Sequence, residues 1–283
     1  MEILKRFGDY VLQNSSSGSN LSGSYVRALK YTTALLRETK PVFANLEPIW
    51  EISSIERLEE IFRCVKREER RKDASVFAST KLPKSYWKQR FCSNAVKMFA
   101  RFLIDTKRVS KAAELYGESL DPKRVADQIS KWKIHPVFDL DDDVVLESKE
   151  GRDAVRLVKV RMDQAAFRTI VLLNYGSKCC VTGLPIPEVL RASHIVGWSE
   201  NAKTRLLPTN GLCLSATYDA AFDRHLISFD DDYRMVLSPS LREYCTNAAF
   251  QFFFQRYEGW KMRSAIKFPP SKEFLAQHRE RMK

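Results

Sequence analysis

Two residues in the last third of the sequence have types and positions suited to catalysis. His194 lies near the end of the apolar-flanked segment 191–196, and Asn210 directly precedes the apolar run 211–215. A neutral histidine can take a proton from water near pH 7. The side-chain amide of Asn210 can either fix the tilt of that imidazole or ligate a metal ion. We therefore predict that His194 and Asn210 are catalytic residues.

Two carboxylates follow this pair along the chain. Asp219 and Asp223 are four positions apart, so they share one face of a predicted helix. A hard divalent cation bound through oxygen would relieve their mutual repulsion, and we predict that Asp219, Asp223 and Asn210 hold Mg²⁺ or Mn²⁺. The alternative for Asp223 is to cap its helix or to form a salt bridge.

Three arginines near these residues, Arg191, Arg205 and Arg224, offer positive charge for phosphate contacts. A base, a bound cation and guanidinium groups together meet the needs of metal-assisted phosphodiester hydrolysis, because the cation stabilises the negative charge on the scissile phosphate. The remaining histidines are interpreted as structural side chains: His135, His225 and His278.

The elements that must position these residues are a strand over 191–196, a polar connection, a strand over 211–215 and a helix carrying both aspartates. The surrounding sequence predicts further elements, which are a helix over 161–175, short apolar segments at 179–182 and 226–229, an aromatic-rich segment at 250–257 and a basic helix over 272–281.

The N-terminal part is predicted to be helical. Helical spacing of apolar residues occurs over 25–37, 54–66 and 85–103, with Ser22 or Ser24 as the N-cap of the first helix. The acidic segment 139–150 is interpreted as an exposed linker rather than a metal site. We therefore predict an α+β chain with an all-helical domain over 1–148 and a second domain over 149–283.

The amino-acid composition indicates which kinds of partner and cellular setting the protein has. The 283 residues include 47 Lys and Arg against 35 Asp and Glu, which gives a net charge of +12 and favours a polyanionic partner. Neither a signal peptide nor an apolar run long enough to span a membrane is evident. The six scattered cysteines are interpreted as structural thiols in a reduced, cytoplasmic setting.

The order of strand, histidine, loop, asparagine, strand and helix resembles the ββα-metal (His-Me) finger of HNH endonucleases. Similar pieces recur in order over roughly 155–283, and they resemble the branch found in bacterial restriction and anti-phage nucleases. These pieces are Gln164-Ala-Ala-Phe-Arg-Thr-Ile, Tyr175-Gly, Cys180-Val-Thr-Gly, Ala192-Ser-His-Ile, Asn210-Gly-Leu-Cys-Leu, Ala221-Phe-Asp and Phe274-Leu-Ala-Gln-His-Arg-Glu.

The resemblance implies a C-terminal HNH domain that cleaves DNA, double-stranded DNA above all, with a divalent cation. It makes His194 the general base and Asn210 the middle residue of the family's name. A role in restriction or anti-phage defence, with a homodimer or a partner subunit of a defence system, rests on the resemblance alone. RNA remains open as a substrate. Some HNH proteins hold a structural zinc with paired CxxC motifs, but Cys180 is followed by Val-Thr-Gly, so no structural zinc is expected.

The sequence departs from the family at two positions. Tyr218-Asp219 stands where the helix often has a histidine, and Ser193 stands where many relatives have an aspartate ligand. Two alternatives therefore stay open: a nucleic-acid-binding protein with a catalytically silent finger, and a nuclease subunit active only with a partner or ligand.

The N-terminal helices resemble, more weakly, the helical arm-like DNA-binding domain of tyrosine recombinases. The similar segments are 24–31 and 97–103, where aromatic and basic residues interleave. A packing or dimerisation domain is the alternative interpretation of this part of the chain.

Overall fold

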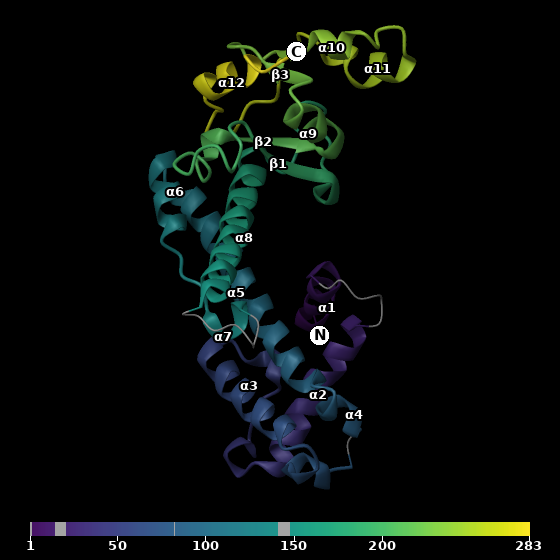
Figure 1. The fold of residues 1–283 in the computed structure, drawn as a ribbon, viewed down its shortest axis with the longest axis vertical. Helices are drawn as coiled ribbons and strands as arrows, with labels where there is room; N and C mark the ends of the chain where they lie inside the picture. Colours follow the sequence, from purple (N-terminus) through teal and green to yellow (C-terminus); the bar gives the residue numbers. More distant parts are fainter. Residues whose placement is uncertain (1, 15–20, 82, 141–147) are drawn as a thin grey trace. The chain divides into compact units, whose positions relative to one another are not determined.

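The computed structural model describes residues 2–14, 21–81, 83–140 and 148–283 (Figure 1). The chain divides into two compact units, residues 1–107 with 134–158 and residues 108–133 with 159–283. This division differs from the predicted single boundary at residue 148, because it falls inside two long helices. Most of the predicted acidic linker, 141–147, lies outside the described residues. In the part of the chain that is described, no helix is both long and apolar enough to cross a membrane.

All the regular secondary structure in the described residues of unit 1 is helical. Its α-helices are α1 (Glu2–Asn14), α2 (Leu21–Thr39), α3 (Ile55–Arg70), α4 (Lys84–Lys88), the first part of α5 (Phe91–Glu118), α7 (Pro136–Asp139) and the start of α8 (Lys149–Asn174). Short 3₁₀ turns connect them at η1 (Pro41–Phe43), η2 (Ile49–Glu51), η3 (Lys72–Ala74) and η4 (Val76–Ser79). Their apolar faces form one core that includes the fully buried Phe7, Leu36, Trp87 and Phe99.

The predicted N-terminal helices are present with altered ends. Ser54 is the N-cap of α3, since its side chain accepts from the backbone N–H of Arg57. Helix α2 begins at Leu21, so the prediction of Ser22 or Ser24 as its N-cap is wrong. The single helix predicted over 85–103 is divided into α4 and α5, because Arg90 between them has a left-handed φ of 62°.

Unit 2 combines helices with two small antiparallel sheets. Its helices are the end of α5, α6 (Pro122–Ser130), most of α8, α9 (Ala216–Asp223), α10 (Pro239–Arg242), α11 (Ala248–Phe253) and α12 (Lys272–Arg279), with 3₁₀ turns η5 (Pro187–Val189), η6 (Pro208–Asn210) and η7 (Gln255–Tyr257). Its strands are β1 (Leu190–His194), β2 (Gly211–Ser215), β3 (Ile227–Phe229) and β4 (Met235–Leu237).

The first sheet and the helix after it form the arrangement that the sequence predicts around His194. Strand β1 pairs with β2 so that Ala192 lies opposite Cys213 and His194 lies opposite Gly211. Helix α9 begins directly after β2 and packs on both strands (Figure 1). Phe222 of α9 is fully buried in the core beneath the sheet. Burial of this side chain contributes about 2–3 kcal/mol and fixes α9 against the strands.

The apolar segment predicted at 179–182 is not a strand in the structure. Residues 179–182 form a turn, in which the Cys179 carbonyl accepts from the Gly183 N–H and the Cys179 N–H donates to the Leu184 carbonyl. The turn is joined to β2 because the backbone N–H of Cys180 donates to the carbonyl of Cys213 at 2.7 Å. The thiols of Cys179, Cys180 and Cys213 are buried in the core of unit 2.

Candidate active site

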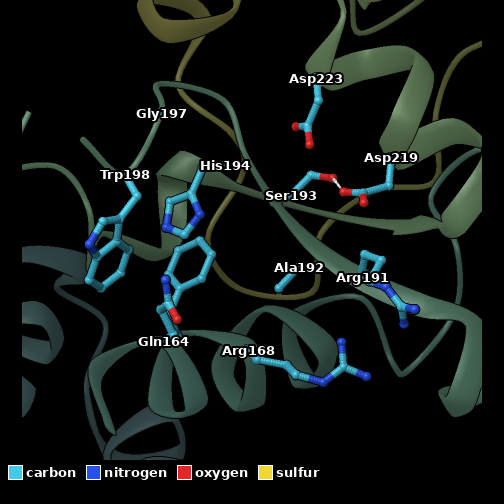
Figure 2. Close-up of a pocket in the computed structure, with 11 residues that line it drawn as sticks. Gln164, Arg168, Arg191, Ala192, Ser193, His194, Gly197, Trp198, Asp219 and Asp223 are labelled. Atoms are coloured by element: carbon cyan, nitrogen blue, oxygen red, sulfur yellow. Dashed lines mark hydrogen bonds between the residues drawn. The ribbon is translucent and has the colours of Figure 1, made fainter. Parts of the chain in front are cut away.

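An open cleft of about 630 Å³ lies where β1, α9 and α8 meet in unit 2. Figure 2 shows that its walls come from these elements and from the loop after β1. The lining residues are Gln164, Phe167, Arg168, Arg191, Ala192, Ser193, His194, Gly197, Trp198, Asp219 and Asp223. The cleft thus brings together four of the predicted site residues: His194, Asp219, Asp223 and Arg191.

The imidazole of His194 has a defined orientation. Its Nε2 lies 2.9 Å from the backbone carbonyl oxygen of Arg205. A carbonyl oxygen can only accept, so Nε2 carries the proton of the neutral ring and Nδ1 is the unprotonated nitrogen. Among the described residues, no group forms a hydrogen bond to Nδ1. The second nitrogen is therefore available to accept a proton from a water molecule or a substrate.

Aromatic rings enclose this imidazole on two sides. Phe167 stacks on it with ring centroids 3.9 Å apart and planes 12° from parallel, and Trp198 meets it edge-on at 5.4 Å. Burial lowers the pKa of His194 below its usual 6.5, and the Arg205 charge lowers it further, whereas the Arg205 carbonyl opposes the shift. The imidazole is therefore neutral at pH 7, as a general base must be.

Arg205 contributes to the site through its backbone. Its guanidinium lies over the Trp198 ring at 5.0 Å, and Arg205 does not line the cleft. The cation–π contact holds the residue whose carbonyl orients His194. Arg205 is predicted from its residue type to contact phosphate, whereas this geometry favours a positioning role.

Asn210 is fully buried, and its side chain forms hydrogen bonds with the backbone of the loop between β1 and β2. Its amide oxygen accepts from the Val196 N–H at 2.8 Å, and its amide nitrogen donates to the carbonyls of Val196 and Thr204 at 3.0 and 3.2 Å. Its own backbone carbonyl accepts from the Ile195 N–H. The amide is thus used in loop contacts away from the cleft, which favours positioning over metal binding.

Asp219 and Asp223 lie on the face of α9 that borders the cleft (Figure 2). Asp219 accepts a hydrogen bond from the hydroxyl of Ser193 on β1. Burial raises the pKa of Asp223, and the negative charge of Asp219 raises it further. A cation between the two carboxylates would offset the repulsion between their negative charges.

The donor set is compatible with Mg²⁺ or Mn²⁺. Both ions prefer carboxylate oxygens, and Mg²⁺ is often held by one or two carboxylates with water and substrate phosphate completing its shell. Within the described residues, no group of three or more His, Cys, Asp or Glu side chains is placed to hold a metal ion. Asp219 and Asp223 are the two carboxylates that line the cleft.

Tyr218 occupies the position where the resemblance leads one to expect a histidine, but its side chain leaves the cleft. It is buried on the opposite side of α9, and its hydroxyl donates to the carbonyl of Phe253. The neighbouring Asp219 is the residue that faces the cleft. This substitution therefore removes a nitrogen ligand without placing another ring in the site.

The cleft has a basic side. Arg191 is exposed, and Arg168 of α8 donates to the carbonyls of Leu190 and Pro187 at 2.8 and 3.1 Å. Arg224 does not line the cleft, since it points along α9 and donates to the carbonyl of Ala220. Of the three predicted phosphate-binding arginines, only Arg191 lies in the cleft.

Sequence reasoning missed Gln164 and Arg168, both of which line the cleft from α8. Gln164, Phe167 and Arg168 have the i, i+3, i+4 spacing of one helix face. This spacing in the motif Gln164-Ala-Ala-Phe-Arg places a polar, an aromatic and a basic side chain on one helix face, but the spacing alone does not specify that the face meets His194.

The other two histidines of unit 2 belong to the packing between α9, β3 and α12. His278 is buried, stacks on Phe222 at 3.8 Å and contacts the Phe222 carbonyl and the Ser228 hydroxyl, each at 3.0 Å. His225 lies 3.0 Å from it through Nδ1. Burial lowers the pKa of His278 to about 4, and the adjacent His225 lowers it as well.

Comparison with known families gives an independent view of this region. A family model described as HNH endonuclease matches residues 179–230. The matched segment contains β1, β2, α9 and β3, and thus His194, Asn210 and both aspartates of the cleft. A comparison with curated proteins gave no match. Residues 179–230 of this chain are thus similar to HNH endonucleases, as the sequence motifs in this segment indicate.

Proposed function

We propose that this protein is a metal-dependent endonuclease that hydrolyses phosphodiester bonds of DNA in the cleft of unit 2. The observation that carries the proposal is the state of His194, whose neutral ring has a protonated Nε2 tied to the Arg205 carbonyl and an available Nδ1. The same cleft has carboxylates on one side and guanidinium groups on the other. Such a site can accept a proton, hold a cation and bind a phosphate.

In the proposed reaction, the exposed Arg191 binds a phosphate oxygen of the substrate, with Arg168 adding positive charge behind it. Nδ1 of His194 takes a proton from the attacking water, and the Arg205 carbonyl stabilises the imidazolium that forms. Asp219 and Asp223 would hold Mg²⁺ or Mn²⁺. Such an ion, when bound, stabilises the negative charge of the pentavalent phosphate and of the leaving oxygen.

DNA is the proposed substrate because the net charge of +12 favours a polyanion and because the HNH resemblance points to DNA. Unit 1 is proposed to bring DNA or a second subunit to the cleft. A role in restriction or anti-phage defence follows from the resemblance described above and not from the geometry of the cleft.

A second candidate is a finger that binds nucleic acid and is silent unless a partner completes it. The observation that favours it is Tyr218, which stands in the place of a histidine and turns away from the cleft. Such a protein would bind DNA with a steep dependence on salt and would cut only with its partner, or not at all.

Cleavage of supercoiled plasmid by purified full-length protein tests the proposal. We expect nicking or linearisation with Mg²⁺ or Mn²⁺, no cleavage in EDTA, and a loss of about 10²–10⁴-fold in His194→Ala. His225→Asn is a matched control, because residue 225 has a φ of 56°, which asparagine tolerates. Salt-sensitive DNA binding without cleavage by any of these proteins would instead support the silent finger.

A further inference from the structure

Unit 2 has a second cavity, of about 620 Å³, that belongs to none of the chemistry described so far. It lies between the start of α9 and the segment containing α11 and η7. Thr217 and Tyr218 line it from α9, and Phe252, Phe253 and Tyr257 line it from the other side. Its volume falls in the range of small-ligand sites, and its walls are mostly apolar with a few hydroxyl groups.

The aromatic wall of this cavity is open to solvent. The side chains of Phe252 and Phe253 are 60% and 45% exposed, and their rings stand perpendicular at 5.1 Å. The guanidinium of Arg256 lies 5.2 Å from the ring centres of both Phe252 and Tyr257. Adjacent exposed aromatic rings with an arginine on their faces are a typical platform for stacking nucleobases.

A second guanidinium, that of Arg263, lies beside one of the residues that line the cavity. Gly183, which lines the cavity, has a φ of +75°, and a Cβ added there would lie 2.5 Å from Nη2 of Arg263. The backbone N–H of Arg263 donates to the Cys180 carbonyl at 2.8 Å, which fixes this segment beside the glycine. The glycine of the Cys180-Val-Thr-Gly motif thus allows a cation to pack at the edge of the cavity.

Helix α9 separates this cavity from the cleft. Tyr218 lines the cavity, whereas the next residue, Asp219, lines the cleft. A helix with its side chains is about 10 Å across, and nucleotides in one strand of a duplex are spaced about 3.4 Å along the axis. The cavity is therefore within a few nucleotides of a phosphate bound beside His194.

We propose that this cavity binds an unpaired nucleobase of the substrate strand close to the cleavage site. The base stacks on Phe252 and Phe253, and Thr182 and Thr217, which also line the cavity, can contact its polar edge through their hydroxyls. Arg256 strengthens the stack and attracts the flanking phosphate. The nearness to a scissile phosphate rests on the proposed function, but the binding of a base does not.

A binding experiment without cleavage tests this inference. The probes are a 30-nucleotide duplex with one bulged 2-aminopurine and the same duplex fully paired, each with full-length protein in EDTA. We expect the wild type to bind the bulged duplex more tightly and to quench the 2-aminopurine by stacking. Phe252→Ala and Phe253→Ala should each weaken binding of the bulged duplex about five- to hundredfold and abolish the quenching. Binding of the paired duplex should change less than twofold.

Tyr244→Ala is the matched control, because Tyr244 is 61% exposed but lies outside the cavity. Equal binding of both probes by the wild type would overturn the inference. The inference would also be overturned if Phe252→Ala and Phe253→Ala still bound the bulged duplex more tightly than the paired duplex. A change that is confined to size-exclusion chromatography, from a dimer to a monomer, would instead assign these rings to an interface between two copies of the chain. If the phenylalanine variants lose the preference while the wild type never cuts plasmid, the inference stands and the proposed nuclease function fails.

Discussion

Nε2 of His194 and the backbone carbonyl of Arg205 form a 2.9 Å hydrogen bond that links the end of β1 to the loop between β1 and β2. The partner of the imidazole is thus a neutral carbonyl and not a carboxylate. A carbonyl fixes the tautomer without adding a full negative charge, so it raises the pKa of His194 less than an aspartate would. The tautomer and the pKa of His194 therefore depend on the conformation of this loop.

The pH dependence of cleavage should report on His194. Burial lowers the pKa of this imidazole below 6.5, and only the neutral ring can accept a proton. We expect kcat/KM to rise with pH below that lowered pKa and to be level through pH 7. A profile measured between pH 4.5 and 8 on a short duplex checks this. A midpoint above 7 would contradict the proposed environment of the ring.

Removal of the Asn210 side chain should destabilise the protein and disorder the site. Asn210→Ala leaves the N–H and carbonyl of Val196 and the carbonyl of Thr204 without their partners, at a cost of about 2–5 kcal/mol in the free energy of unfolding. Urea unfolding measures the loss. Asn201→Ala, at an exposed position in the same loop, is the control and should cost less than about 1 kcal/mol.

The two aspartates of α9 should control the need for metal. We expect Asp219→Asn and Asp223→Asn each to raise the Mg²⁺ concentration for half-maximal cleavage by about tenfold or more, since each replaces a charged carboxylate of the proposed site with a neutral amide. Titration of the cleavage rate with Mg²⁺ measures this. Asp232→Asn, on an exposed turn, is the control. Unchanged metal dependence in both cleft variants would place the cation elsewhere.

His278 should make the folded state sensitive to acid. Its pKa is about 4 in the folded protein against 6.5 for an ordinary histidine, so the unfolded state binds more protons between these values. The stability it contributes is fully present above pH 6.5 and falls as the pH falls. We expect a loss of about 2 kcal/mol between pH 7 and 5 from this residue. Urea unfolding at both pH values should give a smaller loss for His278→Gln; equal losses would contradict the assignment.

Much of the finger was predictable because its signals are local. Strand β2 begins at Gly211 and ends at Ser215 as predicted, and the four-residue spacing placed Asp219 and Asp223 on one face. His194 lies at the end of β1, where the apolar segment indicated. These features depend on residues close together in the sequence, and periodicity is a reliable guide to them.

The direction of a side chain across the fold was not predictable in the same way. Asn210 and Arg205 have residue types that suit a metal and a phosphate, but both are directed by contacts with the loop 195–209. Arg168 reaches the cleft because α8 packs under β1, which no local pattern specifies. The break at Arg90 depends on backbone conformation, since Arg90 has a left-handed φ.

The most direct test of the central claim is chemical rescue of the base. In His194→Gly, plasmid cleavage with Mg²⁺ at pH 7.5 should fall by about 10²–10⁴-fold, because the proton acceptor is gone. Added imidazole should restore cleavage by His194→Gly in proportion to its concentration. It should not restore cleavage by Asp219→Asn, because that variant retains His194. Cleavage by His194→Gly at the wild-type rate would contradict the assignment of His194 as the general base.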